Sequence, residues 1–439
     1  MDAASFASSL PLDQADVVSL YSRRARTLAE IGSGAVLHRS AALRFRHDHL
    51  LQGGRVLGAF AAAKVAKRRF GRLRRRQVNP DVPRQEVAPS SVVTDKVALI
   101  LNPKARHVNK STVRSAAAIA GKEHTFECST LESLEDALRT ILQRGYSVVA
   151  CGGGDGTVAV LLNTLARICE EWTGSSSPTD WPTLAVLPLG TGNALSRLIG
   201  SGKPLADLRR LTESAGGHSS LRELSAVHPL IVNKDTLCFF AGLGIDAWWL
   251  ADYEKLKKQT SGVRLLGEMV KQVWFGYLCT FLTKTLPGVI RGKYQPFRIS
   301  LRSVGEAYRI DPRRGDVAVR KVDDSLLYSG ECWIVAAGTM PFYGAGLRLF
   351  PFAGMRPGFM HIRVSRVNPA WCLFRWSSIW TGHFRHADCF DFLVREAEIE
   401  MQDGPELLQH SGELMGRQKK VSLRAADDCV RLTDFWDSS

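Results

Sequence analysis

The stretch SVVACGGGDGTV, residues 147–158, decides how the first half of this 439-residue chain is interpreted. Ser147–Cys151 is an apolar run typical of a buried strand, and a segment of helical character extends from Thr157 to Glu170. Glycines let a backbone approach a phosphate without Cβ clashes, and the first turn of a helix offers free N–H groups to an anion. The stretch therefore predicts a phosphate-binding loop, although a tight turn that merely needs glycines would also produce it. Asp155 adds a carboxylate suited to Mg²⁺ or to a hydroxyl proton.

Two further loops follow neighbouring apolar runs. Asn102–Ala105 comes after the run at 97–101, and Leu187–Arg197 (LPLGTGNALSR) comes after the run at 184–187. In an open parallel sheet the carboxyl ends of the strands share one edge, and ligands bind there. We therefore expect the three loops to form one binding edge.

Outward from these loops, apolar runs alternate with segments of helical periodicity. Expected strands cover 97–101, 124–128, 147–151 and 184–187, and expected helices cover 110–120, 131–143 and 157–170. Such alternation predicts an α/β domain with a parallel sheet. Beyond about residue 218 the apolar runs lack regular helices between them, which indicates a mostly antiparallel β domain. The expected organisation is a basic, partly helical N-terminal extension and linker (1–94), an α/β nucleotide-binding domain (95–215) and a β-rich domain (216–439) with a helical insertion at 248–281.

The net charge and its distribution along the chain indicate which class of partner the chain could bind. The chain has 58 Lys and Arg against 43 Asp and Glu, a net of +15, and residues 1–90 hold 16 and 7 of these, a net of +9. Segment 64–76 (KVAKRRFGRLRRR) has eight basic residues and no acidic one. It could be a solvated helix face, a nucleic-acid arm or a docking segment for an anionic membrane. No nucleic-acid module is recognisable elsewhere, so we favour the membrane, where each Lys or Arg contributes about 1 kcal/mol.

Composition and the N-terminus predict a cytoplasmic protein with peripheral membrane association. The chain is 45% hydrophobic and 23% charged, as in an average globular protein. Nine cysteines without a C-x-x-C pair favour reduced thiols. The first residues lack the pattern of a secretory signal, and no run of 18 apolar residues is present.

In combination and in order, the motifs resemble the diacylglycerol-kinase-like lipid kinases, which include bacterial diacylglycerol kinases and the sphingosine and ceramide kinases. The family pattern is N-P, G-G-D-G-T, P-x-G-T-x-N, G-h-G-h-D-A (h is apolar) and D-G-E. The matching segments here are Asn102-Pro103, Gly153–Thr157, Pro188–Asn193, Gly242–Ala247 and Ser411–Glu413. The resemblance covers about residues 96–430. It implies phosphorylation of a lipid hydroxyl that requires ATP and Mg²⁺.

The resemblance also implies roles for single residues. Asp155 would face the phosphates and Mg²⁺, Asp246 would orient the acceptor hydroxyl, and Glu413 would be the general base. The other implied ATP-binding positions are Asn102, Pro103, Lys104, Thr130, Gly152, Gly153, Gly154, Gly156, Thr157, Gly190, Thr191, Asn193, Arg264, Ser411 and Gly412.

Two departures from the family pattern bear on metal binding. Ser411 stands where the family has the Asp of D-G-E, so activity would be weaker or the metal held differently. Bacterial diacylglycerol kinases have a structural Mg²⁺ site where this chain reads FPFAGMRPG, residues 350–358. Arg356 cannot ligate a cation, so we expect no structural metal there.

The expected substrate is diacylglycerol, but a sphingoid base or ceramide stays open because Arg264 precedes an L-G-E-M string, as in sphingosine kinases. NAD kinases and phosphofructokinases also use G-G-D-G, but GTGN and GLGIDA disfavour them. A pseudokinase that binds nucleotide or acidic lipid stays open because of Ser411. An aromatic group could line a lipid site or belong to the core: Trp248, Trp249, Trp274, Phe275 and Tyr277.

Overall fold

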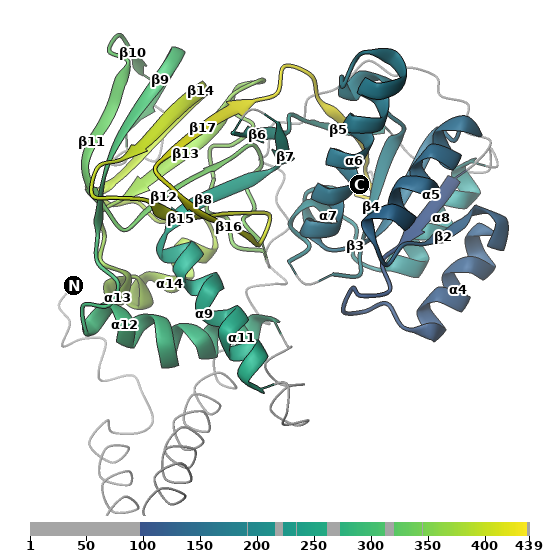
Figure 1. Cartoon of the computed structure of the whole chain (residues 1–439), viewed down its shortest axis with the longest axis horizontal. Helices are drawn as coiled ribbons and strands as arrows, with labels where there is room; N and C mark the ends of the chain where they lie inside the picture. The colour runs from purple at the N-terminus through teal and green to yellow at the C-terminus, as the bar shows by residue number, and fades with distance from the viewer. Residues whose placement is uncertain are drawn as a thin grey trace, which may run out of the picture. The chain divides into compact units, whose positions relative to one another are not determined.

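The computed structural model describes residues 97–190, 192–215, 223–233, 235–260, 273–311, 320–344 and 346–436. All of these residues belong to one compact unit of the chain. The N-terminal extension with its basic segment 64–76, together with Thr191 and Arg264, lies outside the described residues. A six-stranded sheet A and a twelve-stranded sheet B organise the described part (Figure 1). The expected fold class, a parallel α/β domain with a mostly antiparallel β domain, is confirmed.

Sheet A has the strand order β2-β1-β3-β4-β18-β5. Its members are β1 (Val97–Leu101), β2 (Thr125–Glu127), β3 (Val148–Gly153), β4 (Thr183–Pro188), β5 (Glu223–Val227) and β18 (Val430–Thr433). All pairs are parallel except β18 with β5. Strand β1 is buried along its whole length, as expected of a parallel strand with helices on both faces.

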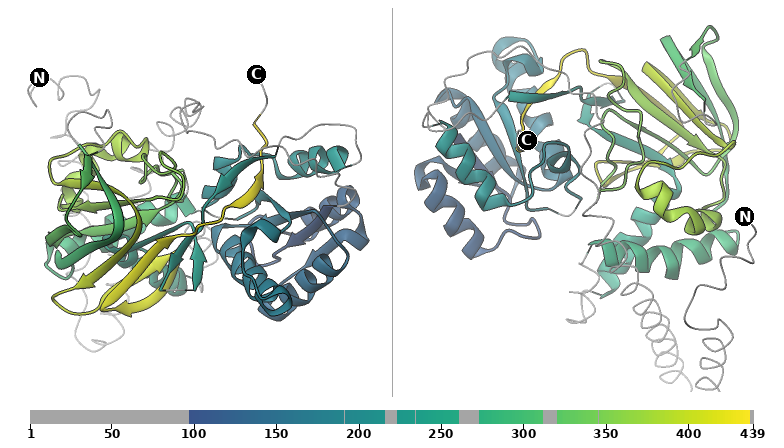
Figure 2. Two further views of the ribbon diagram at one scale, coloured as in Figure 1. Left: turned by 90° about the horizontal axis from the view of Figure 1, so that it is seen from above. Right: turned by 180° about the vertical axis from the view of Figure 1, so that it is seen from behind.

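Two helix pairs cover sheet A (Figure 2). Helices α4 (Lys110–Ala120) and α8 (Pro204–Ala215) pack together, as do α5 (Leu131–Gln143) and α6 (Asp155–Thr173). The short helix α7 (Ala194–Leu198) follows the turn after β4. Helix α5 buries Leu134, Ala137, Leu138 and Ile141, the apolar face that its periodicity predicts.

Sheet B is antiparallel in every pair, with the order β16-β15-β8-β12-β13-β14-β17-β6-β7 and β9 joined to β14, β10 and β11. The strands are β6 (Leu230–Val232), β7 (Thr236–Cys238), β8 (Phe240–Gly244), β9 (Phe297–Ile310), β10 (Arg320–Val322), β11 (Leu326–Cys332), β12 (Ile334–Gly338), β13 (Met360–Ser365), β14 (Cys389–Met401), β15 (Glu406–His410), β16 (Glu413–Gln418) and β17 (Lys420–Ala425). Residues of β8, β9, β12, β13, β14 and β17 share one apolar core.

A group of helices lies beside sheet B, at the lower end in Figure 1. It consists of α9 (Ile245–Thr260), α11 (Val273–Thr280), η3 (Phe281–Thr285), α12 (Leu286–Ile290), α13 (Pro369–Cys372), η4 (Leu373–Arg375) and α14 (Trp376–Trp380). The described helices between β8 and β9 thus extend on both sides of the insertion that we expected at 248–281. No helix within the described residues has the length and apolar content needed to cross a bilayer.

Two strands from beyond residue 216 pair within sheet A rather than in the second sheet. Strand β18 lies between β4 and β5, and Leu432 pairs with Leu184. This placement differs from the expected assignment of all residues after 216 to the β-rich domain. An apolar run reveals that a strand is buried but not which of two sheets satisfies its backbone groups, so the sequence pattern could not assign these strands.

Candidate active site

The glycine-rich turn joins β3 to α6 and leaves the start of the helix without a side-chain cap. Helix α6 begins at Asp155, and Gly154 is its N-cap residue. A Cβ at Gly153 would lie 2.6 Å from the Thr157 side chain, and one at Gly152 would lie 2.5 Å from Leu101. A side chain at Gly153 would clash with Thr157, and one at Gly152 would force buried leucines to move. The uncapped N–H groups of α6 are available to an anion.

The turn after β4 packs directly on the glycine-rich turn. A Cβ at Gly190 would lie 2.1 Å from the Cα of Gly154. Asn193 has a left-handed backbone with φ of 50°, which Asn tolerates better than most residues. Its Oδ1 accepts a hydrogen bond from Gly190 N at 3.2 Å, and its Nδ2 donates to Gly190 O at 3.1 Å. Asn193 thus holds the second turn closed, while Gly190 of that turn packs on Gly154 of the first.

The turn after β1 completes this edge of sheet A. Asn102 Nδ2 donates a hydrogen bond to Thr157 Oγ1 at 3.0 Å, which links the first turn to helix α6. Asn102 Oδ1 accepts from Lys104 N at 2.9 Å, so the same side chain shapes its own turn. Lys104 adds a cation to the edge. The three expected loops therefore lie together.

Asp155 links the two glycine turns through its carboxylate. Its Oδ1 accepts from Ala194 N at 2.7 Å and from Leu195 N at 3.3 Å, at the start of α7. Its Oδ2 lies toward Gly192, because a Cβ added at Gly192 would lie 2.3 Å from this oxygen. Burial raises the pKa of Asp155 to about 6, against the opposing effect of the two backbone donors. One oxygen is therefore structurally engaged and the other faces the cavity described below.

Asp246 stands in the first turn of α9, within a buried hydrogen-bond network. Its Oδ2 accepts from Tyr343 OH and, at 3.1 Å, from Gln409 Nε2, and Gln409 is also bonded to Tyr343. Its Oδ1 is buried without a side-chain partner in the described residues. Burial raises the pKa of Asp246 above its ordinary value. This carboxylate is fixed in position and keeps one oxygen for a further donor.

Ser411 and Gly412 form the two-residue turn between β15 and β16. Their φ angles are 48° and 83°, the sign pattern of a type I′ hairpin turn. Ser411 N donates to Phe240 O at 3.2 Å, and Gly412 N donates to Gln409 Oε1 at 3.2 Å. The turn carries the exposed Glu413 to the start of α6, where an added Cβ at Gly156 would lie 3.0 Å from Glu413 Oε1.

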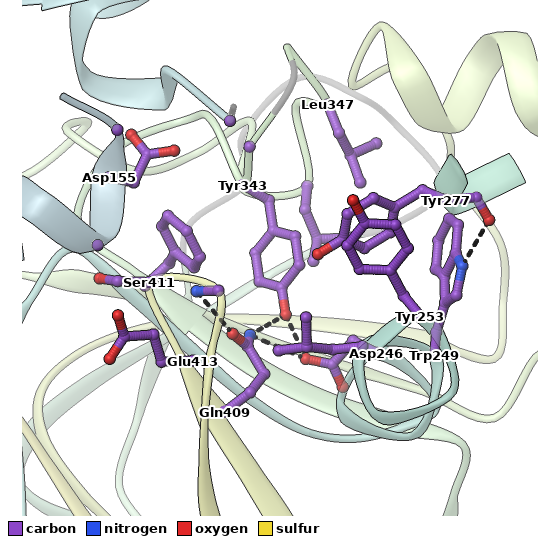
Figure 3. Close-up of a pocket in the computed structure, with 18 of the residues that line it drawn as sticks. Asp155, Asp246, Trp249, Tyr253, Tyr277, Tyr343, Leu347, Gln409, Ser411 and Glu413 are labelled. Carbon is purple, nitrogen blue, oxygen red and sulfur yellow. Dashed lines mark hydrogen bonds between the residues drawn. The ribbon is translucent and has the colours of Figure 1, made fainter. Parts of the chain in front are cut away.

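A cavity of about 990 Å³ connects these groups to an aromatic chamber (Figure 3). Asp155, Ser411 and Glu413 lie at one end, Trp249, Tyr253 and Tyr277 lie at the other, and Asp246 lies between them. In the chamber, Tyr253 stacks on Tyr277 at 4.2 Å between ring centroids, and Trp249 Nε1 donates to Tyr277 O at 2.8 Å. Further apolar lining comes from Phe281, Leu347, Trp376, Ile379 and Trp380.

Three members of the aromatic group considered in the sequence, Trp248, Trp249 and Tyr277, divide between core and cavity. Trp248 is buried and stacks on Tyr294 with 5.0 Å between centroids, so it belongs to the core. Trp249 and Tyr277 line the cavity. Adjacent residues of a helix point about 100° apart, which explains why neighbouring tryptophans differ in role.

Most of the expected site residues face this cavity. Those that line it are Asn102, Pro103, Lys104, Gly154, Asp155, Gly156, Thr157, Gly190, Asp246, Ser411, Gly412 and Glu413. Gly152, Gly153 and Asn193 stand behind the lining and shape the turns. Thr130 is exposed and caps α5, accepting from Ser133 N at 3.1 Å. Thr191 and Arg264 lie outside the described residues.

The sequence pattern did not reveal Tyr343 or Gln409, the partners of Asp246. Tyr343 lies in the glycine-containing segment PFYGAG that follows β12. A tyrosine hydroxyl next to a glycine is the one sequence feature that could have indicated a residue of the site. Gln409 precedes Ser411 by two residues, the spacing of side chains on one face of a strand. Neither residue belongs to a motif.

Arg356, in the stretch 350–358, packs on aromatic rings. Its guanidinium lies 3.9 Å from the ring centroid of Tyr308 and 5.3 Å from that of Phe359. Throughout the described residues, no group of three or more His, Cys, Asp or Glu side chains could hold a metal ion by itself.

In this fold, a glycine-rich edge of the parallel sheet A opens into an aromatic chamber beside the antiparallel sheet B. Residues 96–222 match the family described as diacylglycerol kinase catalytic domain. The match contains all three turns of the edge.

Two curated proteins of Pseudomonas aeruginosa, from strains PAO1 and UCBPP-PA14, are similar to this segment. Both are named "Probable lipid kinase YegS-like", and they are 35% and 34% identical over 127 residues. Each match spans 28% of this chain and 38% of the length of the relative. A solved structure of a diacylglycerol kinase from Bacillus anthracis str. Sterne aligns with 16% identity and a TM-score of 0.48, covering 78% of this chain and 97% of that one.

Proposed function

We propose that the protein is a lipid kinase that transfers the γ-phosphoryl group of ATP to a lipid hydroxyl. The observation that carries the proposal is the single cavity that runs from the uncapped start of α6, past Asp246, into the aromatic chamber. The cavity thus offers N–H groups for the phosphates of ATP, a carboxylate for the lipid hydroxyl and an apolar chamber for the lipid chain. The similarity of residues 96–222 to diacylglycerol kinase catalytic domains supports the same activity.

ATP would bind with its phosphates at the two glycine turns. The N–H groups at the start of α6 and the positive end of its dipole favour phosphate oxygens, and Lys104 adds a positive charge. The contact between Gly190 and Gly154 keeps both turns free of side chains at this point. A backbone cradle of this kind positions phosphates without contributing covalent chemistry, which is what phosphoryl transfer mainly requires.

The carboxylates of the site fit Mg²⁺ that arrives with ATP. Asp155 and Glu413 both flank the start of α6. Mg²⁺ in kinases is commonly held by one or two carboxylates together with substrate phosphates, not by a complete protein cage. The lack of a three-ligand cluster in the described residues agrees with this type of site. The bound ion would neutralise charge on the phosphates.

Asp246 would position the acceptor. Its Oδ1, which has no side-chain partner in the described residues, can accept a hydrogen bond from the lipid hydroxyl, while Tyr343 and Gln409 fix Oδ2. In the transfer, the lipid oxygen forms a bond to the γ-phosphorus, the bond to the ADP oxygen breaks, and the hydroxyl proton passes to a carboxylate. Glu413 is the candidate base because it lies beside the start of α6, where the phosphates would sit.

Diacylglycerol is the favoured acceptor, with a sphingoid base or ceramide as the alternative. Lys104 and Arg106 also line the cavity, so its charged side chains include cations as well as the carboxylates. Because cations and carboxylates line the same cavity, its charge does not discriminate a protonated sphingoid amine from a neutral lipid. The similarity of residues 96–222 to diacylglycerol kinase catalytic domains supports diacylglycerol as the acceptor.

A lipid panel in mixed micelles with labelled ATP and Mg²⁺ tests the proposal. We expect transfer to diacylglycerol and a loss of at least about a hundredfold in Asp155→Asn, which removes charge but keeps an oxygen for the N–H groups of α7. Asp155→Ala also removes that oxygen, so comparing the two variants separates chemistry from helix capping. Bound ATP without transfer to any lipid would refute the kinase proposal.

Ser411 decides between an active enzyme and a pseudokinase. We propose that the enzyme is active, because the Ser411-Gly412 turn is fixed by hydrogen bonds from its two backbone N–H groups to Phe240 O and Gln409 Oε1, which need no carboxylate at position 411. Ser411→Asp is expected to change transfer by less than about tenfold, a difference of about 1.4 kcal/mol in barrier. A wild-type protein that binds ATP without transfer, and gains transfer in Ser411→Asp, would support the pseudokinase.

We also propose that segment 64–76 attaches the enzyme to anionic membrane. Its eight basic residues and the absence of acidic ones support this role. Replacing its basic residues by Gln is expected to weaken binding to anionic vesicles and to reduce the sensitivity of binding to salt. Unchanged binding would assign the segment to another task.

A further inference from the structure

The helices that wall the aromatic chamber expose large apolar side chains on their outside. Phe374 is 85% exposed, Ile290 is 71% exposed and Trp371 is 39% exposed. The first two are the most exposed large apolar side chains in the described residues. Ile290 ends α12, and Trp371 lies in α13, which packs against α12. We call this surface, with Arg291 and Arg375, the α12–η4 face.

The α12–η4 face is basic as well as apolar. Segments 281–293 and 366–380 contain five Lys or Arg residues and no Asp or Glu. Arg291 and Arg375 have no ion-pair partner among the described residues, and the guanidinium of Arg375 lies 5.4 Å from the ring centroid of Trp371. Two acidic groups approach from other elements, Asp252 at 3.7 Å from Lys293 and Asp388 at 3.8 Å from Arg366. The remaining charge is positive.

The face is continuous with the wall of the cavity. Phe374 lies in η4, which is followed directly by α14, whose Trp376, Ile379 and Trp380 line the chamber. Pro369 and Cys372 of α13 also line it. Residues 369–380 therefore present apolar side chains both to the chamber and to solvent. Such a segment could separate a lipid-binding chamber from a membrane surface.

We propose that the α12–η4 face docks on an anionic lipid bilayer and brings the chamber to the membrane surface. The inference rests on the proposed lipid kinase function for its purpose, but binding can be measured without activity. Exposed aromatic and aliphatic tips among arginines suit the interface, where apolar side chains enter the acyl boundary and guanidinium groups meet phosphates. An acidic protein would match the charge of this face, but the protruding Phe374 and Ile290 favour a surface into which apolar side chains can insert.

Co-sedimentation of the full chain with phosphatidylcholine vesicles, with and without phosphatidylserine, tests the proposal. The double variant Phe374→Ser, Ile290→Ser is expected to bind both vesicle types about ten- to hundredfold more weakly. The double variant Arg291→Gln, Arg375→Gln should lose about fivefold per residue, and only on vesicles that contain phosphatidylserine. Leu131→Ser, a 58% exposed apolar residue that begins α5, is the matched control and should bind normally.

Folding and activity are followed separately. Circular dichroism and nucleotide affinity should match the wild type in all variants, since none of the changed residues lines the cavity. Phosphorylation of a dispersed short-chain lipid should also persist in the variants. If neither the wild type nor any variant phosphorylates the lipid, the kinase proposal is refuted, but the docking proposal is not. The docking proposal is overturned if the Phe374→Ser, Ile290→Ser variant binds vesicles as tightly as the wild type. It is also overturned if sedimentation velocity shows that this variant has lost a dimer while its vesicle binding is unchanged.

Discussion

The substitution Gly190→Ala gives a sharp test of how the two glycine turns, where we propose that ATP binds, are held together. The new Cβ would lie 2.1 Å from the Cα of Gly154, whereas ordinary contact begins at 3.4 Å. The two turns must therefore separate by about 1.3 Å, and both partners are backbone atoms that cannot rotate away. Displacements of about 1 Å at a reacting centre can cost about a hundredfold in rate, and overpacking costs about 1–3 kcal/mol of stability.

We therefore expect Gly190→Ala to lower ATP affinity, to lower lipid phosphorylation about a hundredfold and to unfold at lower urea concentration. Titration with a fluorescent ATP analogue, the micelle assay and urea denaturation measure the three effects. Gly202→Ala is the control, because an added Cβ there meets nothing within 4 Å. If Gly190→Ala binds ATP and unfolds like Gly202→Ala, the turns are not held in the contact described.

Three further predictions concern buried groups. Asp246→Asn should reduce lipid phosphorylation about a hundredfold or more while ATP affinity stays normal; a parallel loss of ATP affinity would contradict its role at the acceptor. Asp391→Asn removes the buried partner of Arg363, at 2.7 Å, and should lower the free energy of unfolding by about 3–5 kcal/mol in urea denaturation; no measurable loss would contradict this. Burial lowers the pKa of His361 from 6.5, so the unfolded chain binds a proton that the folded chain does not, and stability should fall as pH drops below 6.5. His361→Gln should flatten this dependence in denaturation series, and an unchanged slope would rule out His361 as its source.

Local patterns predicted the edge of the site because its chemistry is concentrated in short motifs. The glycine turns, Asp155 and Asp246 each lie at a change from strand to helix, where periodicity and glycine together indicate geometry. The three turns meet because parallel strands align their carboxyl ends, so the topology supplied the contacts between distant motifs.

The acceptor side depended on contacts that no local pattern contains. Tyr343 reaches Asp246 across 97 residues of sequence, and Gln409 does so across 163. The chamber wall combines α9, α11 and α14, and which face of each helix is inward depends on packing. Trp248 and Trp249 illustrate this, since one packs on Tyr294 and the other lines the cavity.

The position of β18 between β4 and β5 affects the order in which the protein can fold. Because Val430–Thr433 separates these strands, β5 cannot find its neighbour in sheet A until the ribosome has made nearly the whole of sheet B. Sheet A would thus be completed late in synthesis, through a contact of very long sequence separation, which slows folding. Both ends of the β domain are also tied into the same sheet, so the two chain crossings restrict any opening of the cavity to a narrow set of rotations.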